Sequence, residues 1–275
     1  MPPRSGAPLP EFDRPPVSEV AIAVQFEPLD QWRAVHAGLF WGQIKDRYPL
    51  NETQPPLPSQ IERYDGYIPQ TPQVIIAPVD VDLARFWFLT EDKTQLIQLQ
   101  RDRFIINWRK LIGNEIYPRY EAILRPRFIR ELNEFREFLD DLQLGTLNIQ
   151  QCEITYVNDI LKGEGWDSVS DSLKLFSAWW GKGTDGWLPI PERLMVSGSF
   201  LIPEQAGRLH FLTQHLFRIP DMHEMIQLRL IARGNPRGQT TESIAAWLDI
   251  GREWIVRGFA DLTSPYAHNL WGRSK

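Results

Sequence analysis

Polar side chains gather on one face of a predicted three-strand meander in the first half of the chain. Within the runs QLIQLQ and RFIINWR, these side chains alternate with apolar ones: Gln98, Gln100, Asn107 and Arg109. Because successive side chains of a strand point to opposite faces, strand pairing would gather these residues into one patch. Amides and a guanidinium recognise anions, nucleobases and peptide backbones. The pattern indicates either a ligand-binding concavity or a solvated sheet face.

A second group of polar residues is expected on two other elements. Tyr117 and Arg119 open a long predicted helix, and a helix N-terminus with a guanidinium beside it attracts anions. Tyr156 and Asn158 share one face of a later strand. If the fold brings these residues together, they form a ligand site or the scattered site of an enzyme. Otherwise they are a helix start packed by tyrosines and an amide that caps a strand end.

Other patterns of catalytic or metal-binding residues are weak. The five histidines form no HxH, HxxxH or HExxH spacing, so no metal site is predicted. The run from Gly181 to Gly183 lacks the strand–GxxxxGK[ST]–helix context of a phosphate loop, and no GxSxG elbow is present. We therefore expect no catalytic residue, no metal and no cofactor.

Hydrophobic periodicity predicts the elements that would position these residues in the first half of the chain. A β-rich run is followed by a helix whose apolar stripe includes Val35 and Leu39. After the meander comes a long helix that Pro126 should kink or divide. The predicted ranges are 19–26, 30–48, 85–109 and 117–142.

The second half of the chain repeats this order of elements. The sequence LIQL at 96–99 has a short echo, MIQL, at 225–228. A glycine-rich loop at 181–186 separates the short helix of this half from its meander. The predicted ranges are 147–160 for a strand, 168–180 for a short helix, 193–202, 207–217 and 225–233 for a meander, and 241–262 for a long helix.

The repeated order predicts an α+β fold built from two tandem strand–helix–meander–helix units. The units are residues 18–145 and 146–275, behind a Pro-rich arm at 1–17 that is disordered or extended. Two such units would share one curved antiparallel sheet with both long helices on one face, as in TATA-box-binding-like or helix-grip folds. The alternative is two ferredoxin-like units.

Several segments carry a resemblance to a known family. The quoted motifs are EVAIAVQF at 19–26, LIQLQRDRFIINWRK at 96–110 and YPRYE at 117–121. Together with the strand EITYVNDI and the terminal AHNLWGR, they resemble a sporadically distributed bacterial family of proteins of roughly this length. That family has no established activity, so the resemblance implies no catalytic residue. Its patchy distribution implies a role in a bacterial defence or toxin-linked system.

Composition narrows the class of protein. The chain is 43% hydrophobic with 11 Trp and 14 Phe, which allows a large aromatic core. Cys152 is the only cysteine, so no disulfide can form within the chain. No apolar run approaches the roughly 18 residues of a membrane helix, and the Pro-rich start lacks the apolar core of a signal peptide. These features predict a cytoplasmic protein without membrane contact.

The function expected from these observations is non-enzymatic binding of an unidentified ligand or partner. A protein partner or a second copy of the chain is expected, because a sheet with exposed edges readily pairs. The alternatives are nucleic-acid binding through the polar sheet face and an enzyme site assembled from scattered polar residues. The formal charge of −5 argues against a nonspecific nucleic-acid coat and leaves room for a local basic groove.

Overall fold

The computed structural model describes residues 8–64, 81–177, 192–219 and 221–275. In the first half, the predicted strand, helix, meander and long helix are all present in that order. The elements of this half are β1 Val17–Phe26, α1 Ala34–Ile44, β2 Leu50–Gln54, η1 Val81–Leu83, β3 Arg85–Leu89, β4 Gln95–Gln100, β5 Arg103–Arg109, η2 Tyr120–Leu124 and α2 Arg125–Asp141.

The second half follows the predicted order as well, and α4 has the predicted bounds. The short helix expected at 168–180 consists of η3 and α3, while residues 178–180 and the glycine-rich loop lie outside the described residues. The elements of this half are β6 Ile149–Leu161, η3 Val169–Asp171, α3 Ser172–Leu175, β7 Met195–Ile202, η4 Pro203–Gln205, β8 Gly207–Arg218, β9 His223–Gly234, α4 Thr241–Leu262 and α5 Pro265–Leu270.

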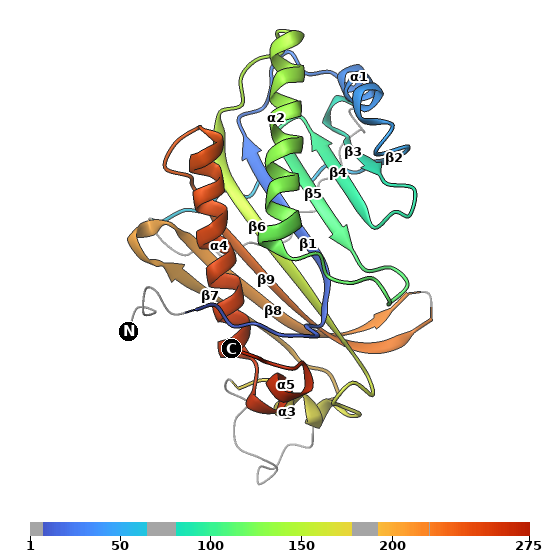
Figure 1. Cartoon of the computed structure of the whole chain (residues 1–275), viewed down its shortest axis with the longest axis vertical. Coiled ribbons are helices and arrows are strands. Elements are labelled where there is room, and N and C mark those ends of the chain that lie inside the picture. Colours follow the sequence, from blue (N-terminus) through green and yellow to red (C-terminus); the bar gives the residue numbers. More distant parts are fainter. Residues whose placement is uncertain (1–7, 65–80, 178–191, 220) are drawn as a thin grey trace.

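The described strands form one open antiparallel sheet in the order β2-β3-β4-β5-β1-β6-β9-β8-β7. The two central strands are β1 and β6, which pair along most of their length. Each central strand continues outward into the meander of its own half (Figure 1). The prediction of an α+β fold with an antiparallel sheet is therefore confirmed.

Helices α2 and α4 both lie on one face of this sheet (Figure 1). The strands alternate, so that their apolar side chains face these helices and form the core. Full burial of each large apolar side chain contributes roughly 1.5–3 kcal/mol to folding. Core residues of this layer include Ile22, Ile154, Phe128, Phe135 and Leu248.

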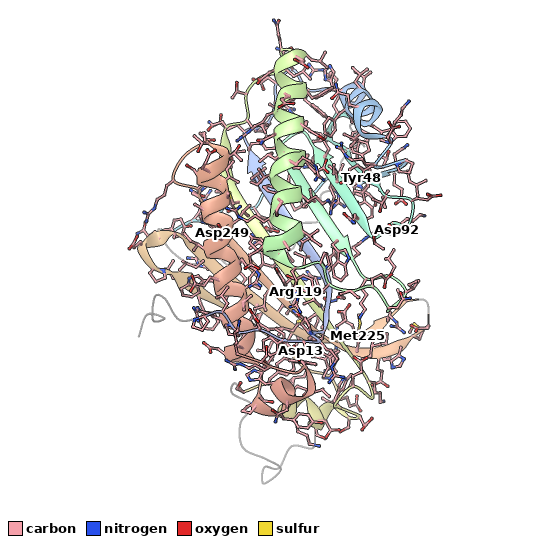
Figure 2. The ribbon with its side chains drawn as sticks, viewed as in Figure 1. Asp13, Tyr48, Asp92, Arg119, Met225 and Asp249 are labelled. Carbon is pink, nitrogen blue, oxygen red and sulfur yellow. The ribbon has the colours of Figure 1, made fainter. Side chains whose placement is uncertain are left out.

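A buried polar network fixes α2 onto the sheet. Arg127 donates to the backbone oxygens of Asn107 and Leu96 at 3.0 and 3.1 Å. The Tyr48 hydroxyl, labelled in Figure 2, donates to the fully buried Glu131 at 3.0 Å. Because buried charges are costly unless paired, these bonds hold α2 in one position on the sheet.

The helix predicted at 30–48 is shorter than expected, and its apolar stripe, predicted to include Ile44 and Phe40 as well as Val35 and Leu39, is only partly the buried face. Its buried residues are Ala37, Phe40 and Ile44, whereas Val35 and Leu39 are exposed. The expected stripe was counted from Trp32, which is buried but precedes the helix. Phe40 and Ile44 of the predicted stripe are thus confirmed as buried, and Val35 and Leu39 were wrongly included.

Residues 8–16 of the Pro-rich arm are ordered rather than disordered. Phe12 is buried and forms an isolated β-bridge with Arg273. Its ring packs edge-on against Phe259 of α4, with the centroids 5.2 Å apart. The extended alternative therefore describes these residues, which link the start of the chain to its end. Residues 1–7 of the arm lie outside the described residues.

Candidate ligand-binding site

The residues ahead of α2 are shaped by a π-turn that Pro126 helps to define. The turn spans Tyr120–Leu124. The Arg125 N–H donates to the backbone oxygen of Tyr120, five residues back, whereas in an α-helix it would donate to that of Glu121. Pro126 lies in the first turn of α2 and has no N–H to donate, so the change from π-turn to α-helix falls where one helical hydrogen bond is missing. The helix predicted at 117–142 is thus not divided: it begins at Tyr120 as the π-turn, which runs directly into α2, so Tyr117 and Arg119 precede it. Single π-turns are frequent at functional sites.

A small cavity opens where this turn meets β6 and α4. The cavity has a volume of about 70 Å³. Its lining includes all four residues of the second predicted group, Tyr117, Arg119, Tyr156 and Asn158. This volume suits a few water molecules or one carboxylate group. The other walls are largely apolar and include Phe12, Val17, Leu230, Ile255 and Phe259.

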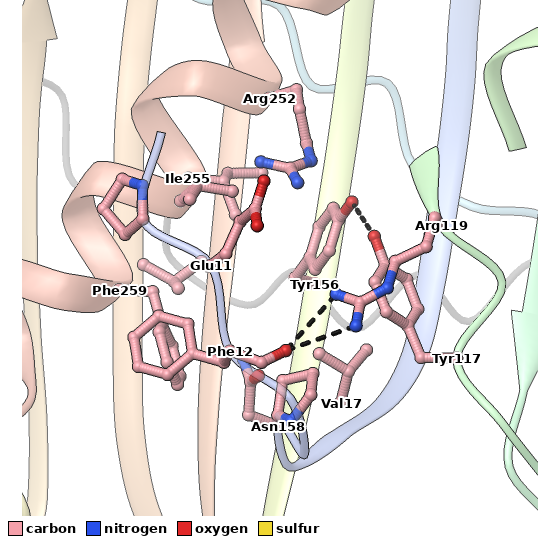
Figure 3. Close-up of a pocket in the computed structure, with 14 residues that line it drawn as sticks. Glu11, Phe12, Val17, Tyr117, Arg119, Tyr156, Asn158, Arg252, Ile255 and Phe259 are labelled. Atoms are coloured by element: carbon pink, nitrogen blue, oxygen red, sulfur yellow. Dashed lines mark hydrogen bonds between the residues drawn. The ribbon is translucent and has the colours of Figure 1, made fainter. Parts of the chain in front are cut away.

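Two tyrosines form one wall of the cavity. Their hydroxyl oxygens are 2.8 Å apart and share a hydrogen bond (Figure 3). Burial raises the pKa of Tyr156 well above its ordinary value and also raises the pKa of Tyr117, against the opposing effect of Arg252. Both phenols therefore stay protonated near neutral pH. One hydroxyl proton forms the hydrogen bond between the two tyrosines, and the other hydroxyl proton can be donated to a ligand or to a neighbouring side chain.

Arg252 is the functional candidate that sequence reasoning missed. Its Nε and Nη1 atoms are buried and have no hydrogen-bond partner, although the side chain lines the cavity. The guanidinium carbon lies 5.6 Å from the Tyr120 ring centre and 5.8 Å from that of Tyr156. The sequence could have indicated it, because Arg252 lies at helical spacing between Leu248 and Ile255 and so falls on the apolar stripe of α4.

Arg119 contributes a second guanidinium at the cavity. Its two terminal nitrogens both donate to the Phe12 backbone oxygen at 3.3 Å, and it lies over the Tyr117 ring (Figure 3). Asn158 instead donates to the Leu228 oxygen at 3.1 Å and is almost fully buried. Arg119 thus ties the N-terminal segment over the cavity, while Asn158 serves mainly to join β6 and β9.

A wider cavity of about 490 Å³ adjoins the first, with Arg252 as a shared wall. Asp249 lines it and is engaged by Arg125 through two hydrogen bonds of 2.8 and 3.0 Å. Tyr120 also donates to Asp249. At the smaller cavity, Glu11 pairs with Lys275 at 3.1 Å. These two carboxylates have cationic partners other than Arg252, whereas Glu121, which also lines the wider cavity, interacts electrostatically with Arg252.

The first predicted group lies on the opposite face of the sheet. Gln98 and Asn107 are buried and lie together, as expected from the pairing of their strands. The Gln98 amide donates to the Asn107 side-chain oxygen at 2.6 Å. Gln100 is bonded to the backbone of Leu57 instead, and Arg109 donates to the Lys93 oxygen at 3.0 Å. The amides of this patch are therefore largely satisfied within the protein and offer few free donors.

One carboxyl on this second face is electrostatically unusual. Glu19 accepts a hydrogen bond from Asn107 at 2.5 Å. Burial raises the pKa of Glu19, an effect that outweighs the opposing influence of Asn107 and Arg109. The first predicted group thus continues across β5 to β1 as a buried polar chain.

Comparison with protein-family models, with curated proteins and with solved structures gave no significant match for this chain. Among the described residues, no helix has both the length and the apolar character needed to cross a membrane. The same residues contain no cluster of three or more His, Cys, Asp or Glu side chains arranged to hold a metal ion.

Proposed function

We propose that this protein is a binding protein whose ligand is a small carboxylic acid with an apolar body. The observation that carries the proposal is Arg252, whose buried Nε and Nη1 atoms lack a partner at the cavity wall. A buried charged donor left unpaired costs on the order of 1–3 kcal/mol or more. A ligand carboxylate removes that cost and forms charge-assisted hydrogen bonds.

The walls of the cavity favour an acid that carries an apolar group. Phe12, Ile255 and Phe259 supply apolar surface beside the two guanidiniums and the tyrosine pair. Sites of this kind combine apolar walls with a few polar groups that fix the orientation of the ligand. The wider cavity is lined mainly by charged side chains, including Glu121, Asp249 and Glu253, so the apolar group of the ligand is expected to pack against the walls of the smaller cavity.

The protonation states favour binding over acid–base catalysis. Both tyrosines remain neutral because burial raises their pKa, and guanidinium groups do not deprotonate. The cavity therefore presents donors and positive charge. A general base would need a free acceptor within reach of its substrate, and the carboxylate in the lining of the smaller cavity, Glu11, is an exposed side chain that uses one oxygen to pair with Lys275.

Matched pairs of small acids and amides test this proposal. Benzoate and hexanoate, compared with benzamide and hexanamide, keep the apolar body and remove only the charge. We expect the acids to shift the NMR signals of residues around Arg252 in a saturable way and the amides to have little effect. Equal binding of acids and amides, or no binding of either, would reject the carboxylate site.

Nucleic-acid binding through the second sheet face is the other candidate function. There, Arg85 and Arg109 lie over the Trp87 ring, 5.4 and 5.3 Å from its centre. Bases stack on such aromatic and guanidinium surfaces. This candidate predicts binding of labelled single-stranded oligonucleotides that weakens with salt and is lost in Arg109→Ala. The absence of binding at low salt would dismiss it.

We also infer that the two halves arose as structural repeats that share one curved sheet. The order β1-β5-β4-β3 on one side matches β6-β9-β8-β7 on the other, and each half ends in a long helix. The match supports the saddle arrangement of TATA-box-binding-like or helix-grip folds over two separate ferredoxin-like units. This inference concerns architecture and is independent of the ligand.

A further inference from the structure

The strand β7 leaves one edge of the sheet without a partner among the described residues. It is eight residues long, carries no charged side chain and exposes Met195, Phe200 and Leu201 by 57, 47 and 53%. The other edge, β2, is five residues long and includes Glu52. Charge and short length protect an edge from pairing, so only β2 has this protection.

The sequence around β7 is chemically palindromic. It reads Leu-Met-Val-Ser-Gly-Ser-Phe-Leu-Ile from Leu194 to Ile202, with Gly198 at its centre. Two copies placed antiparallel about Gly198 would set every residue opposite one of the same kind. The facing pairs are Leu194 with Ile202, Met195 with Leu201, Val196 with Phe200, and Ser197 with Ser199.

The backbone of β7 is oriented correctly for this pairing. The His215 N–H donates to the Leu194 oxygen, so Leu194 belongs to a pair hydrogen-bonded to β8. In an antiparallel ladder, alternate residues point their N–H and C=O groups to the other side. Met195, Ser197, Ser199 and Leu201 therefore direct these groups to the free edge. In the palindromic register each of these four residues faces another of the four in the second copy, so their free N–H and C=O groups can bond to each other.

Gly198 also suits the centre of such an interface. A Cβ atom at this position would lie 2.4 Å from Cε1 of Phe211, so the Phe211 ring occupies the space of the missing side chain. Phe200 stacks on the same ring, with the centroids 5.9 Å apart. Glycine within a strand often marks a close approach of another backbone. A two-fold axis through Gly198 would bring the aromatic pairs of two copies together on one face.

We propose that this chain forms a homodimer by antiparallel β7–β7 pairing about a two-fold axis through Gly198. The axis is perpendicular to the sheet, so the two sheets join into one with all long helices on the same face. The occupant of the edge is a second copy, because the palindromic order matches β7 to itself and an unrelated strand would not require it. The proposal does not depend on the ligand of the cavity.

The first test introduces a lysine at one edge strand of the sheet, either β7 or β2. Ser197→Lys on β7 introduces the edge charge that natural proteins use against pairing, and Asn51→Lys makes the matched change on β2. By analytical ultracentrifugation we expect dimers for wild type and Asn51→Lys, and monomers for Ser197→Lys. Circular dichroism confirms that each variant is folded. A monomeric wild type, or a dimer lost only in Asn51→Lys, would overturn the proposal.

Cysteine cross-linking tests the register, because Ser197 faces Ser199 of the other copy only if the axis passes through Gly198. A mixture of Ser197→Cys and Ser199→Cys chains should form a disulfide-linked dimer on mild oxidation, since facing residues have Cα atoms about 5.5 Å apart. Neither variant alone should do so, and the natural Cys152 is buried. Cross-linking of one variant alone, or none in the mixture, would overturn the register.

Discussion

The hydroxyl groups of Tyr117 and Tyr156 meet at 2.8 Å and join the two halves of the chain at one wall of the smaller cavity. Tyr117 comes from the segment between β5 and α2, and Tyr156 from the central strand β6. Their rings pack edge to face, with centroids 6.0 Å apart. The cavity is therefore built by contacts between halves, so its shape depends on how β1 and β6 pair.

Tyr156→Phe should destabilise the fold without changing the shape of the cavity. The ring remains, but the half-buried Tyr117 hydroxyl loses its hydrogen bond to Tyr156, at a cost of about 1 kcal/mol. Urea unfolding measures the free energy difference. Tyr266→Phe is the control, because that exposed hydroxyl donates a long bond of 3.3 Å to the Gly165 oxygen. Equal losses in both variants would contradict a specific role for the pair.

Glu131→Gln should cost more, because it breaks a buried ionic network. Glu131 is fully buried, accepts from Tyr48 and forms an ion pair with Arg47 at 3.0 Å. The amide of the variant keeps one acceptor oxygen where the carboxylate served Tyr48, Arg47 and Arg130 with two, and its NH2 group lacks an acceptor there, so we expect a loss of about 2–3 kcal/mol. Glu134→Gln is the matched control, since Glu134 also pairs with Arg47 but is 33% exposed. A smaller loss for Glu131→Gln than for Glu134→Gln would refute this.

Glu19→Gln should stabilise the protein at neutral pH and have little effect in acid. The pKa of Glu19 is raised in the fold, so the unfolded chain ionises first, near 4.5, as the pH increases. Stability is therefore lost as the pH rises from that value through the folded pKa, and each pKa unit corresponds to about 1.4 kcal/mol. The neutral amide of the variant carries no such penalty, and its oxygen still accepts from Asn107.

Unfolding free energies at several pH values measure the difference between wild type and Glu19→Gln. We expect the difference to appear above about pH 4.5 and to grow toward neutral pH. Glu52→Gln, at an exposed position of β2, should follow wild type at every pH. A larger gain in acid than at pH 7 would show that the pKa shift has the opposite sign.

Regular elements were predictable because each depends on local periodicity. The bounds of α4 follow from a 3.6-residue pattern, and the meander follows from runs of β-formers joined by short polar links. Val35 and Leu39 were wrongly placed on the buried face of α1 because Trp32, a buried residue ahead of the helix, has helical spacing to Val35.

The candidate site was predictable only in parts. Tyr117, Arg119, Tyr156 and Asn158 were each identified, but their meeting depends on the pairing of β1 with β6, which no local pattern encodes. Phe12 was assigned to a disordered or extended arm, because a Pro-rich segment gives no sign of the long-range bridge to Arg273. Strand pairing over long separations is set by the whole core rather than by neighbouring residues.

Calorimetric titration of hexanoate into wild type and Arg252→Gln tests the proposed carboxylate site most directly. Arg237→Gln is the control, because Arg237 is highly exposed and pairs only with Glu204 among the ion pairs described here. We expect wild type and Arg237→Gln to bind alike and Arg252→Gln to bind at least about tenfold more weakly. Unchanged affinity in Arg252→Gln would contradict the proposed role of this guanidinium.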